Sequence, residues 1–379
     1  MNKPTEDLRS IELRGRRLTD DPHSNPMLLG CYGCPQLAVC GGLHVSEKVF
    51  DCLALCCGNK AGCTQVCPNA PERFVKQRRE IDNFSLDNVQ RTMPLGFCTK
   101  IDVAALIYHG SNRAEPLSAD AVALRLADLV SFKSGSLKFS TREQLCGAFQ
   151  ISPLARIIVS GVDHDNRVEP WWTLGERRQR VIPELHQLGI ELVTVPNFSV
   201  VMDVPRTDNF HAMKRIALMF AEFQKYGLVC ALHPNGRTEF DFQRWANFIS
   251  TRPEVEVLSY EFITGPGLKA RREFHLNMLA FLAQSAGRPL DLVVRGDPHV
   301  LKFLRPHFRS VVYIDTTAFV KTMRRRKAKR IGNLVLDWPS EHTAPGELLD
   351  HRLQHNVDEQ VAYLRNSFFG FQRQKSMAA

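Results

Sequence analysis

Arg156-Ile157-Ile158-Val159-Ser160-Gly161-Val162 is a short run of mostly apolar, β-branched residues. A longer amphipathic stretch follows at 174–188, and a second apolar run follows at 191–195. The two apolar runs have the length and composition of buried strands, and the middle stretch has apolar residues at the three- and four-residue spacing of a helix. Two strands separated by a helix need a crossover connection, so this stretch predicts a parallel β-α-β unit.

The same alternation continues from about residue 97 to the end of the chain. The predicted strands are Ile101–Tyr108, Arg156–Val162, Glu191–Val195, Leu228–Leu232, Val255–Tyr260, Leu290–Val294, Val311–Ile314 and Asn333–Leu336. The predicted helices include Ala119–Val130, Leu174–Leu188, Asn209–Tyr226, Asp241–Ile249, Leu268–Ser285 and Pro298–Pro306. Eight such units predict an α/β fold, a (β/α)8 barrel of the TIM type. An open doubly wound sheet is the alternative, but its Gly-x-Gly-x-x-Gly turn is absent.

The chain of 379 residues is longer than a barrel of roughly 250 residues requires. We expect a polar lead-in at 1–30, a cysteine-rich module at 31–95 and the barrel at 96–379. Apolar residues make up 44% of the chain, which suits a globular protein with a full core. No apolar run approaches the roughly 20 residues that span a bilayer, and the first residues lack the apolar core of a signal peptide. We therefore expect a cytoplasmic protein with no membrane partner.

Eight of the 11 cysteines lie within 37 residues. They are Cys31, Cys34, Cys40, Cys52, Cys56, Cys57, Cys63 and Cys67. Thiols packed this densely in a reducing compartment indicate metal ligation rather than disulfides. Eight ligands would suffice for two four-thiolate sites, either 4Fe–4S clusters or zinc.

The spacing of these cysteines bears on the choice of metal. A zinc ribbon would show two Cys-x2-Cys pairs, and one is present, at Cys31 and Cys34. The segment from Cys31 to Gly42 resembles the Cys-x2-Cys-x5-Cys stretch of the auxiliary-cluster domains of some radical SAM enzymes. Cys63-Thr64-Gln65-Val66-Cys67-Pro68 is similar to the Cys-x3-Cys-Pro ending of bacterial ferredoxin sites. These resemblances imply one or two iron–sulfur clusters, which we favour, with zinc as the alternative.

Polar residues follow every predicted strand, where barrel enzymes carry their catalytic groups. The catalytic candidates are Asp163, His164, Asp203, His233, Glu261 and Asp297. All of these except Asp203, together with His299, could hold a divalent metal that activates water. Alternatively, Arg237, Arg295 and Lys321 could bind a phosphate or carboxylate. A carboxylate such as Asp163 or Asp297 would then act as a base or nucleophile. An Asp or Asn after a strand also often caps the next helix, which is the structural alternative for each residue.

The formal charge is +9, and the excess is concentrated in a few places. Seven of the ten residues at 321–330 are basic and none is acidic. Such a cluster attracts polyanions without sequence preference, so nucleic acid is an expected partner. The predicted substrate-binding residues are Asn197, Arg237, Arg295, Lys321, Arg324 and Arg325. A solvated helix face is the alternative reading of the basic run.

A second resemblance covers about 70 of the 379 residues. The stretch from Val193 to Arg206, followed by Tyr226-Gly227-Leu228-Val229, resembles a segment of an uncharacterised domain family carried by phages, plasmids and bacterial genomes. That family has no assigned reaction. The resemblance implies a bacterial, barrel-like domain associated with mobile elements, and it implies no catalytic residue.

Taken together, these features predict a metal- or iron–sulfur-containing barrel enzyme that acts on nucleic acid or a phosphate-bearing substrate by metal-assisted hydrolysis or group transfer. The alternative is a non-catalytic nucleic-acid-binding protein that uses the cysteine module and the 321–330 segment. Redox sensing by the cysteine module remains a third possibility.

The choice of metal predicts the appearance of the purified protein. Anaerobically purified full-length chain is expected to be brown and to contain iron and acid-labile sulfide, because thiolates at this spacing ligate iron–sulfur clusters. Absorption spectroscopy and elemental analysis measure both. A colourless preparation with stoichiometric zinc would contradict the iron–sulfur prediction.

Overall fold

The computed structural model describes residues 76–77, 79–97, 99–200, 206–331 and 335–370. Eight parallel strands form one sheet in the order β7-β6-β5-β2-β1-β10-β9-β8. The two edges meet at a parallel bridge between Leu232 and Leu258, where Leu232 N donates to Val257 O at 2.9 Å and Ser259 N donates to Leu232 O at 2.7 Å. The sheet is therefore a nearly closed (β/α)8-type barrel, as the sequence predicts. The barrel strands are β1 (Val103–Leu106), β2 (Ala121–Arg125), β5 (Arg156–Ser160), β6 (Ile190–Thr194), β7 (Cys230–Ala231), β8 (Val257–Phe262), β9 (Asp291–Gly296) and β10 (Ser310–Asp315).

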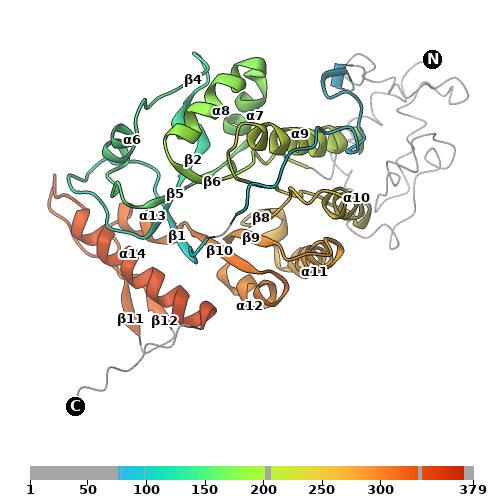
Figure 1. Ribbon diagram of the computed structural model, residues 1–379. Helices are drawn as coiled ribbons and strands as arrows, with labels where there is room; N and C mark the ends of the chain where they lie inside the picture. Colours follow the sequence, from blue (N-terminus) through green and yellow to red (C-terminus); the bar gives the residue numbers. More distant parts are fainter. Residues whose placement is uncertain (1–75, 78, 98, 201–205, 332–334, 371–379) are drawn as a thin grey trace, which may run out of the picture.

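Helices alternate with these strands and surround them (Figure 1). They are α5 (Leu126–Leu129), α6 (Arg142–Phe149), α7 (Asp165–Thr173), α8 (Arg178–Gln187), α9 (Arg206–Lys225), α10 (Glu239–Ser250), α11 (Lys269–Ser285), α12 (Leu301–Leu304), α13 (Thr317–Met323) and α14 (Asp350–Leu364). The connection from β1 to β2, residues 107–120, contains no helix. Within the described residues, no helix is both long and apolar enough to cross a membrane.

Two predicted elements are wrong. The expected helix Ala119–Val130 is instead strand β2 followed by the four-residue helix α5. The expected eighth strand at Asn333–Leu336 is not part of the barrel: Val335–Asp337 forms β12, which pairs antiparallel with β11 (Lys329–Ile331) in a separate hairpin. Asn333 itself lies outside the described residues. The two errors compensate, so the number of barrel strands is eight as expected.

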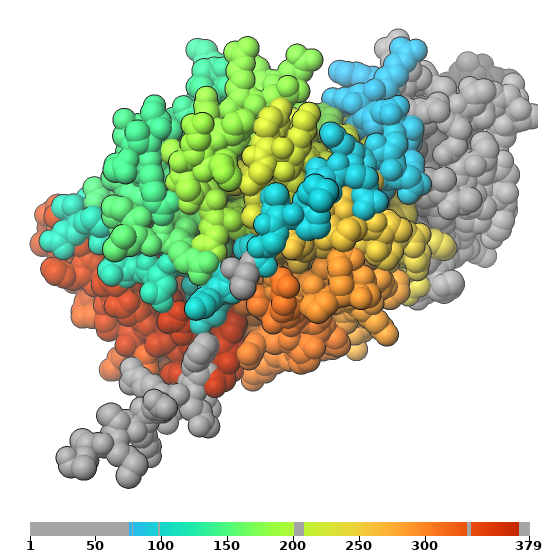
Figure 2. All heavy atoms as spheres, in the orientation of Figure 1, coloured from blue at the N-terminus to red at the C-terminus, as the bar shows by residue number. Residues whose placement is uncertain are grey.

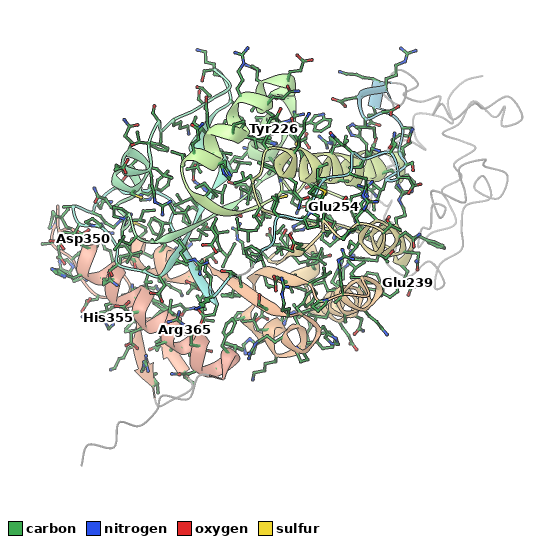
Figure 3. The ribbon with its side chains drawn as sticks, viewed as in Figure 1. Tyr226, Glu239, Glu254, Asp350, His355 and Arg365 are labelled. Atoms are coloured by element: carbon green, nitrogen blue, oxygen red, sulfur yellow. The ribbon has the colours of Figure 1, made fainter. Side chains whose placement is uncertain are left out.

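Helix α14 completes the outer layer after the hairpin. At its start, Leu349 N donates to Asn112 O in the loop after β1. At its end, Arg365 Nε donates to Asp102 at 2.7 Å, just before β1 begins. Asp350 and Arg365 accordingly lie at opposite ends of this helix (Figure 3). The helix therefore runs antiparallel to β1 and covers it, as a barrel helix does.

The barrel has two apolar cores because successive strand residues point to opposite sides of the sheet. The inner core contains Ala104, Leu106, Ala121, Ala123, Ile158, Leu192, Ala231, Val257, Val293, Val312 and Ile314. The intervening residues, such as Val122, Val159 and Leu292, pack against the helices. Phe97 and Ile101 join the inner core from below the strands, so they plug the N-terminal end of the barrel.

Residues 79–97, which we call the strap, lie between α9 and α10. Ile81, Phe84, Leu86 and Val89 are buried, and burying each such side chain is worth roughly 1.5–3 kcal/mol. Figure 2 shows the strap as a continuous blue-to-cyan band across the surface. It follows the direction of α9: Gln77 and Glu80 bind Asp208 and His211 near the helix start, and Thr92 binds Gln224 near its end.

Buried charges on α9 and near the end of α10 hold the strap in place. Lys214 donates to Ser85 O and Asn88 Oδ1. Arg252 donates to Val89 O at 2.6 Å and Asp87 O at 3.3 Å, and it forms a buried ion pair with Glu254 at 3.3 Å.

Replacing Arg252 with Met tests this attachment. We expect a loss of about 3 kcal/mol in the free energy of unfolding, because the strap carbonyls and Glu254 lose a buried charged donor. Urea denaturation followed by circular dichroism measures the loss. Lys329→Met, an exposed change on β11, is the control and should stay within about 0.5 kcal/mol of the wild type. Equal stability of the two variants would show that Arg252 does not hold the strap.

Candidate active site at the barrel mouth

The alternation of inward and outward side chains determines which polar groups enter the mouth of the barrel. Arg125 continues the inward series Ala121, Ala123 on β2. Glu261 continues the series from Val257 on β8, and Arg295 follows Val293 on β9. Glu261 and Arg295 are paired neighbours in the register of β8 and β9. Charged groups from three strands therefore cap the inner core at its C-terminal end.

Arg125 is the centre of one charged cluster. Its Nε donates to Asp128 at 2.6 Å, and its Nη1 lies 3.6 Å from Asp163 Oδ2. Arg167 pairs with the same two carboxylates, at 3.2 Å from Asp128 and 3.9 Å from Asp163. The Arg125 guanidinium also lies over the Tyr108 ring, 4.6 Å from its centroid. This cluster connects the ends of β1, β2 and β5.

Glu261 differs from the other mouth carboxylates. Within the described part of the chain, its carboxyl group makes no hydrogen bond or ion pair. Burial raises the pKa of Glu261, and the charge of Asp163 raises it further, whereas Arg295 and His164 oppose the shift. A half-buried carboxyl group with a raised pKa at a strand end has the properties of a general acid or base.

Arg295 extends across the mouth, where Nη1 donates to Val162 O at 3.1 Å. Gly296, the next residue, has φ of +121°, and a Cβ there would lie 2.5 Å from Phe262 O. Only glycine fits at this position, which allows the end of β9 to approach β8 closely. Tyr313 on β10 donates to Gly296 O and fixes the turn from the other side.

His233 is buried, and its ring stacks on Tyr260 with centroids 5.3 Å apart. The Tyr260 hydroxyl lies 2.8 Å from Nδ1 of His275, and Arg271 lies 3.1 Å from Nε2 of the same ring. Because the arginine can only donate, Nε2 accepts and Nδ1 carries the proton. Burial lowers the pKa of both histidines to about 3, with Arg237 contributing to His233 and Arg271 to His275. Both rings are therefore neutral at neutral pH.

The other predicted catalytic residues are arranged differently. His164 is exposed at the start of α7. Asp297 pairs with Arg272 at 2.7 Å and with His299 at 2.8 Å. Burial pushes the pKa of Asp297 up, but hydrogen bonds from His299 and the charge of Arg272 outweigh this effect and hold it below its usual value. Asp203 lies outside the described residues, as do the eight predicted cysteine ligands.

Two predicted binding residues connect neighbouring loops. Asn197, after β6, accepts a hydrogen bond from Asn235, after β7, at 2.8 Å. Arg237 donates through Nε to Val200 O at 2.7 Å. These bonds fix the loops that form one side of the mouth.

The basic run at 321–330 belongs to the outer layer. Arg325 donates to Thr343, Arg326 to Trp338 O, Lys327 to Glu341 and Arg330 to Glu359. Lys321 lies over the Trp338 ring. In the described chain, Arg324 and Lys329 are the members of this run without such a contact. Lys321, Arg324 and Arg325 therefore do not join the inward-facing groups of the mouth.

Several buried polar atoms near the mouth have unused hydrogen-bonding capacity. Counting partners among the described residues only, no hydrogen bond is made by His109 Nδ1, Asp163 Oδ2, His233 Nδ1, Arg237 Nη1, Arg272 Nε and Arg295 Nε. Buried polar groups are normally satisfied, so these atoms favour a polar ligand. In the same part of the chain, no three His, Cys, Asp or Glu side chains are grouped so that they could hold a metal ion.

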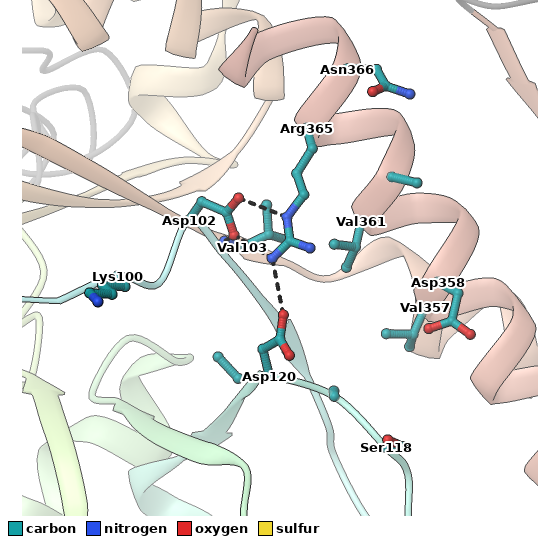
Figure 4. Close-up of a pocket in the computed structure, with 13 residues that line it drawn as sticks. Lys100, Asp102, Val103, Ser118, Asp120, Val357, Asp358, Val361, Arg365 and Asn366 are labelled. Atoms are coloured by element: carbon teal, nitrogen blue, oxygen red, sulfur yellow. Dashed lines mark hydrogen bonds and ion pairs between the residues drawn. The ribbon is translucent and has the colours of Figure 1, made fainter. Parts of the chain in front are cut away.

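A groove of about 490 Å³ lies at the opposite end of the barrel, between α14 and the starts of β1 and β2 (Figure 4). It lies beside the connection that has no helix. Its central charge, Arg365, is bound by Asp102 and Asp120, at 2.7 and 3.3 Å. Because barrel chemistry takes place at the C-terminal ends of the strands, we assign this groove no catalytic role.

Sequence reasoning missed Arg125, Asp128, Arg167 and Tyr108. Arg125 and Asp128 are not apparent from the sequence because the pattern at 119–130 favours a helix. The signal that could have identified Arg125 is the period-two series Ala121, Ala123, Arg125, which places a charge two residues beyond two small inward residues.

Comparisons with known proteins add little to this description. No family model and no curated protein matches the chain. Among solved structures, the chain is similar to tryptophan synthase subunit alpha from Legionella pneumophila str. Paris, with 11% identity, 77% of this chain and 97% of that chain covered, and a TM-score of 0.34. The barrel assignment therefore rests on the strand order and register given above.

The two buried histidines predict acid sensitivity. Their pKa is about 3 in the folded state against 6.5 ordinarily, so the unfolded chain binds more protons between these values and stability falls as the pH drops below about 6.5. Each group contributes at most about 1.4 kcal/mol per pH unit. Urea denaturation at pH 7, 5.5 and 4 should show a smaller loss for His275→Gln than for the wild type. His351→Gln, on the exposed side of α14, is the matched control; equal pH dependence of all three proteins would contradict the assignment.

Proposed function

We propose that this protein is a barrel enzyme that binds a phosphate-bearing substrate, a nucleotide or a nucleic acid, in the mouth and transfers a proton through Glu261. The observation that carries the proposal is the position of Glu261. It has a raised pKa and, within the described chain, no partner, and it lies beside Arg295 in the strand register. A carboxyl group that can exchange a proton and an arginine that can bind an anion are thus adjacent.

Arg295 suits anion binding better than Arg125 because its guanidinium is not paired with carboxylates in the described part of the chain. Arg125 is surrounded by carboxylates, whereas Arg295 donates Nη1 to a neutral carbonyl, and its buried Nε makes no hydrogen bond to the described residues. A guanidinium with free donors binds phosphate in a fixed, two-pronged geometry. Asp163, close to the same site, supports binding of the attacking water or hydroxyl group.

In the proposed reaction Glu261 acts in one of two ways. The ionised form takes a proton from attacking water or a substrate hydroxyl, or the protonated form donates one to the leaving oxygen. The raised pKa makes Glu261 a stronger base than an ordinary glutamate and favours its protonated form. The cysteine segment is proposed to hold iron–sulfur clusters, with zinc as the alternative. The proton transfer relies on barrel residues alone.

The alternative function, nucleic-acid binding without catalysis, depends mainly on the 321–330 run. Arg325, Arg326, Lys327 and Arg330 are bound to other parts of the chain. Such contacts reduce the charge available to a polyanion. We therefore place substrate recognition at the mouth.

Two mouth variants separate binding from chemistry. With pyrophosphate as the binding probe, Arg295→Met should weaken the affinity at least tenfold in calorimetry, whereas Glu261→Gln should leave it equal or tighter because a negative charge is removed. Against a panel of nucleotides and short single-stranded RNA and DNA, analysed by mass spectrometry, Glu261→Gln should lower turnover by roughly 10²–10⁴-fold. The wild-type pH profile should show a limb above pH 4.5, the ordinary value for Glu, and Glu261→Gln should lack it.

Glu184→Gln, an exposed change on α8, is the matched control and should behave like the wild type. The proposal fails if Glu261→Gln turns over the panel at the wild-type rate, or if no member of the panel is converted by the wild type. Unchanged pyrophosphate affinity in Arg295→Met would separately exclude Arg295 as the anion-binding residue.

A further inference from the structure

We propose that the mouth of the barrel binds RNA and cleaves it by transesterification. In this reaction Asp163 takes the proton of a 2′-hydroxyl group, and Glu261 protonates the leaving 5′-oxygen. The inference rests on the proposed function, which leaves open both the choice among nucleotide, DNA and RNA and the choice of nucleophile. The carboxyl groups of Asp163 and Glu261 and the guanidinium of Arg295 carry it.

These three groups come from strand ends that meet at the mouth. Arg295 on β9 donates through Nη1 to Val162 O at 3.1 Å, and Val162 is the residue directly before Asp163. Glu261 on β8 is the register partner of Arg295, and the charge of Asp163 raises the Glu261 pKa. A phosphate bound to Arg295 therefore lies near one carboxyl group from β8 and another from the end of β5.

The Asp163 carboxylate has an oxygen that lacks a hydrogen-bond donor. Its Oδ1 accepts from the backbone N of His164 at 2.8 Å, whereas Oδ2 is buried and accepts from no group in the described chain. Arg125 and Arg167 come only to 3.6 and 3.9 Å from Oδ2, which is too far for a hydrogen bond. Because buried acceptors are normally satisfied, this oxygen favours a ligand that donates, such as a hydroxyl group.

The two arginines beside Asp163 are held to different degrees. The Arg167 side chain is 43% exposed and pairs with Asp128 at 3.2 Å, more closely than with Asp163. A phosphodiester competes with carboxylates for such a guanidinium, so it can draw Arg167 aside and bring a hydroxyl group to Asp163. Arg125 is fixed by Asp128 at 2.6 Å and by the Tyr108 ring, so it keeps a positive charge beside the Asp163 carboxylate.

A phosphate for Arg295 and a neighbouring hydroxyl group for Asp163 occur together in RNA. The 2′-hydroxyl lies on the carbon next to the one that carries the 3′-phosphate, and DNA lacks this donor. In a 5′-mononucleotide, no hydroxyl group lies on the carbon next to the one that carries the phosphate. A phosphodiester also provides the leaving oxygen that Glu261 can protonate. The chemistry of the mouth therefore favours RNA over DNA and over mononucleotides.

The proposed step is balanced by the two carboxyl groups. The 2′-oxygen forms a bond to phosphorus while the bond between phosphorus and the 5′-oxygen breaks. Asp163 receives the proton of the 2′-hydroxyl, and Glu261 gives its proton to the departing 5′-oxygen. Arg295 stabilises the negative charge on the phosphoryl oxygens. The products are a 2′,3′-cyclic phosphate and a 5′-hydroxyl group, and the nucleophile comes from the substrate rather than from water.

Oligonucleotides that differ only at the 2′-position test the inference. The full-length chain is given one short mixed sequence as RNA, DNA and 2′-O-methyl RNA; fluorescence anisotropy measures binding, and mass spectrometry at early times identifies the new ends. We expect cleavage of RNA alone, with cyclic phosphate ends, and an affinity for RNA about tenfold above that for DNA at the same salt concentration. Asp163→Ala should remove this preference and slow cleavage by roughly 10²-fold or more.

Glu176→Gln removes one negative charge from an exposed position before α8, and it should behave like the wild type. The ratio of RNA to DNA affinity does not change when a variant is merely less folded, so loss of the ratio reports on the site. The inference is overturned if the wild type does not cleave RNA, if it binds or cleaves DNA equally well, or if Asp163→Ala keeps the preference.

The ends of the RNA products separate this inference from the proposed function. Linear phosphate ends from the start of the reaction would show that water is the nucleophile, which overturns the role of the 2′-hydroxyl and leaves proton transfer by Glu261 intact. Cyclic phosphate ends at the wild-type rate in Glu261→Gln would instead contradict the proposed function.

Discussion

Successive side chains of a barrel strand point to opposite sides of the sheet, and most of this structure depends on that alternation. Ala104, Ala123 and Ala231 are small residues on the inner side, where converging strands leave little room, while Val122 and Val159 pack outward against helices. The series continues past the apolar layers without changing phase, so the next inward residues are Arg125, Glu261 and Arg295. The constraint that fills the core thus also selects the groups that face the substrate, and a shift of one residue would exchange the two sets.

Seven of the eight barrel strands could be predicted from the sequence because helices separate each of them from the next predicted strand, and parallel strands separated by helices require crossover connections. The exception is β2. Its residues Ala121 to Arg125 include two alanines, which are good helix formers, and the connection from β1 contains no helix to mark the boundary. The hairpin strand β12 resembles a barrel strand in the sequence because a short apolar run carries no information about which sheet it joins. Tertiary pairing, not local propensity, decides both cases.

The sequence predicts at which strand ends the candidate site lies, but it does not predict the partners of the individual residues there. The sequence indicates that Glu261, Arg295 and Asp163 follow strands, and the structure places all three near the mouth. It does not indicate that Asp297 is bound by Arg272 and His299, that His233 is buried against Tyr260, or that Asp315 caps α13 by accepting bonds from Thr317 and Ala318. Such partners come from loops and helices distant in sequence, so spacing along the chain carries no record of them. The basic run misleads for the same reason, because its acceptors Glu341 and Glu359 lie in later segments.

The two ends of the barrel have opposite characters, and the strap contacts both of them. Phe97 and Ile101, at and just beyond the end of the strap, enter the inner core and exclude water from the N-terminal end. Gln77, just before the strap, and Glu80, near the start of the strap, bind α9 at the mouth end. The barrel is therefore closed by apolar side chains where the strands begin, whereas the inward residues Arg125, Glu261 and Arg295 line it with charges where the strands end. In this asymmetric interior, burial raises the pKa of Glu261 although Arg295 is its neighbour. An anion bound to Arg295 would partly neutralise the opposing positive charge, so substrate binding itself would push the Glu261 pKa further upward and favour the proton-donating form.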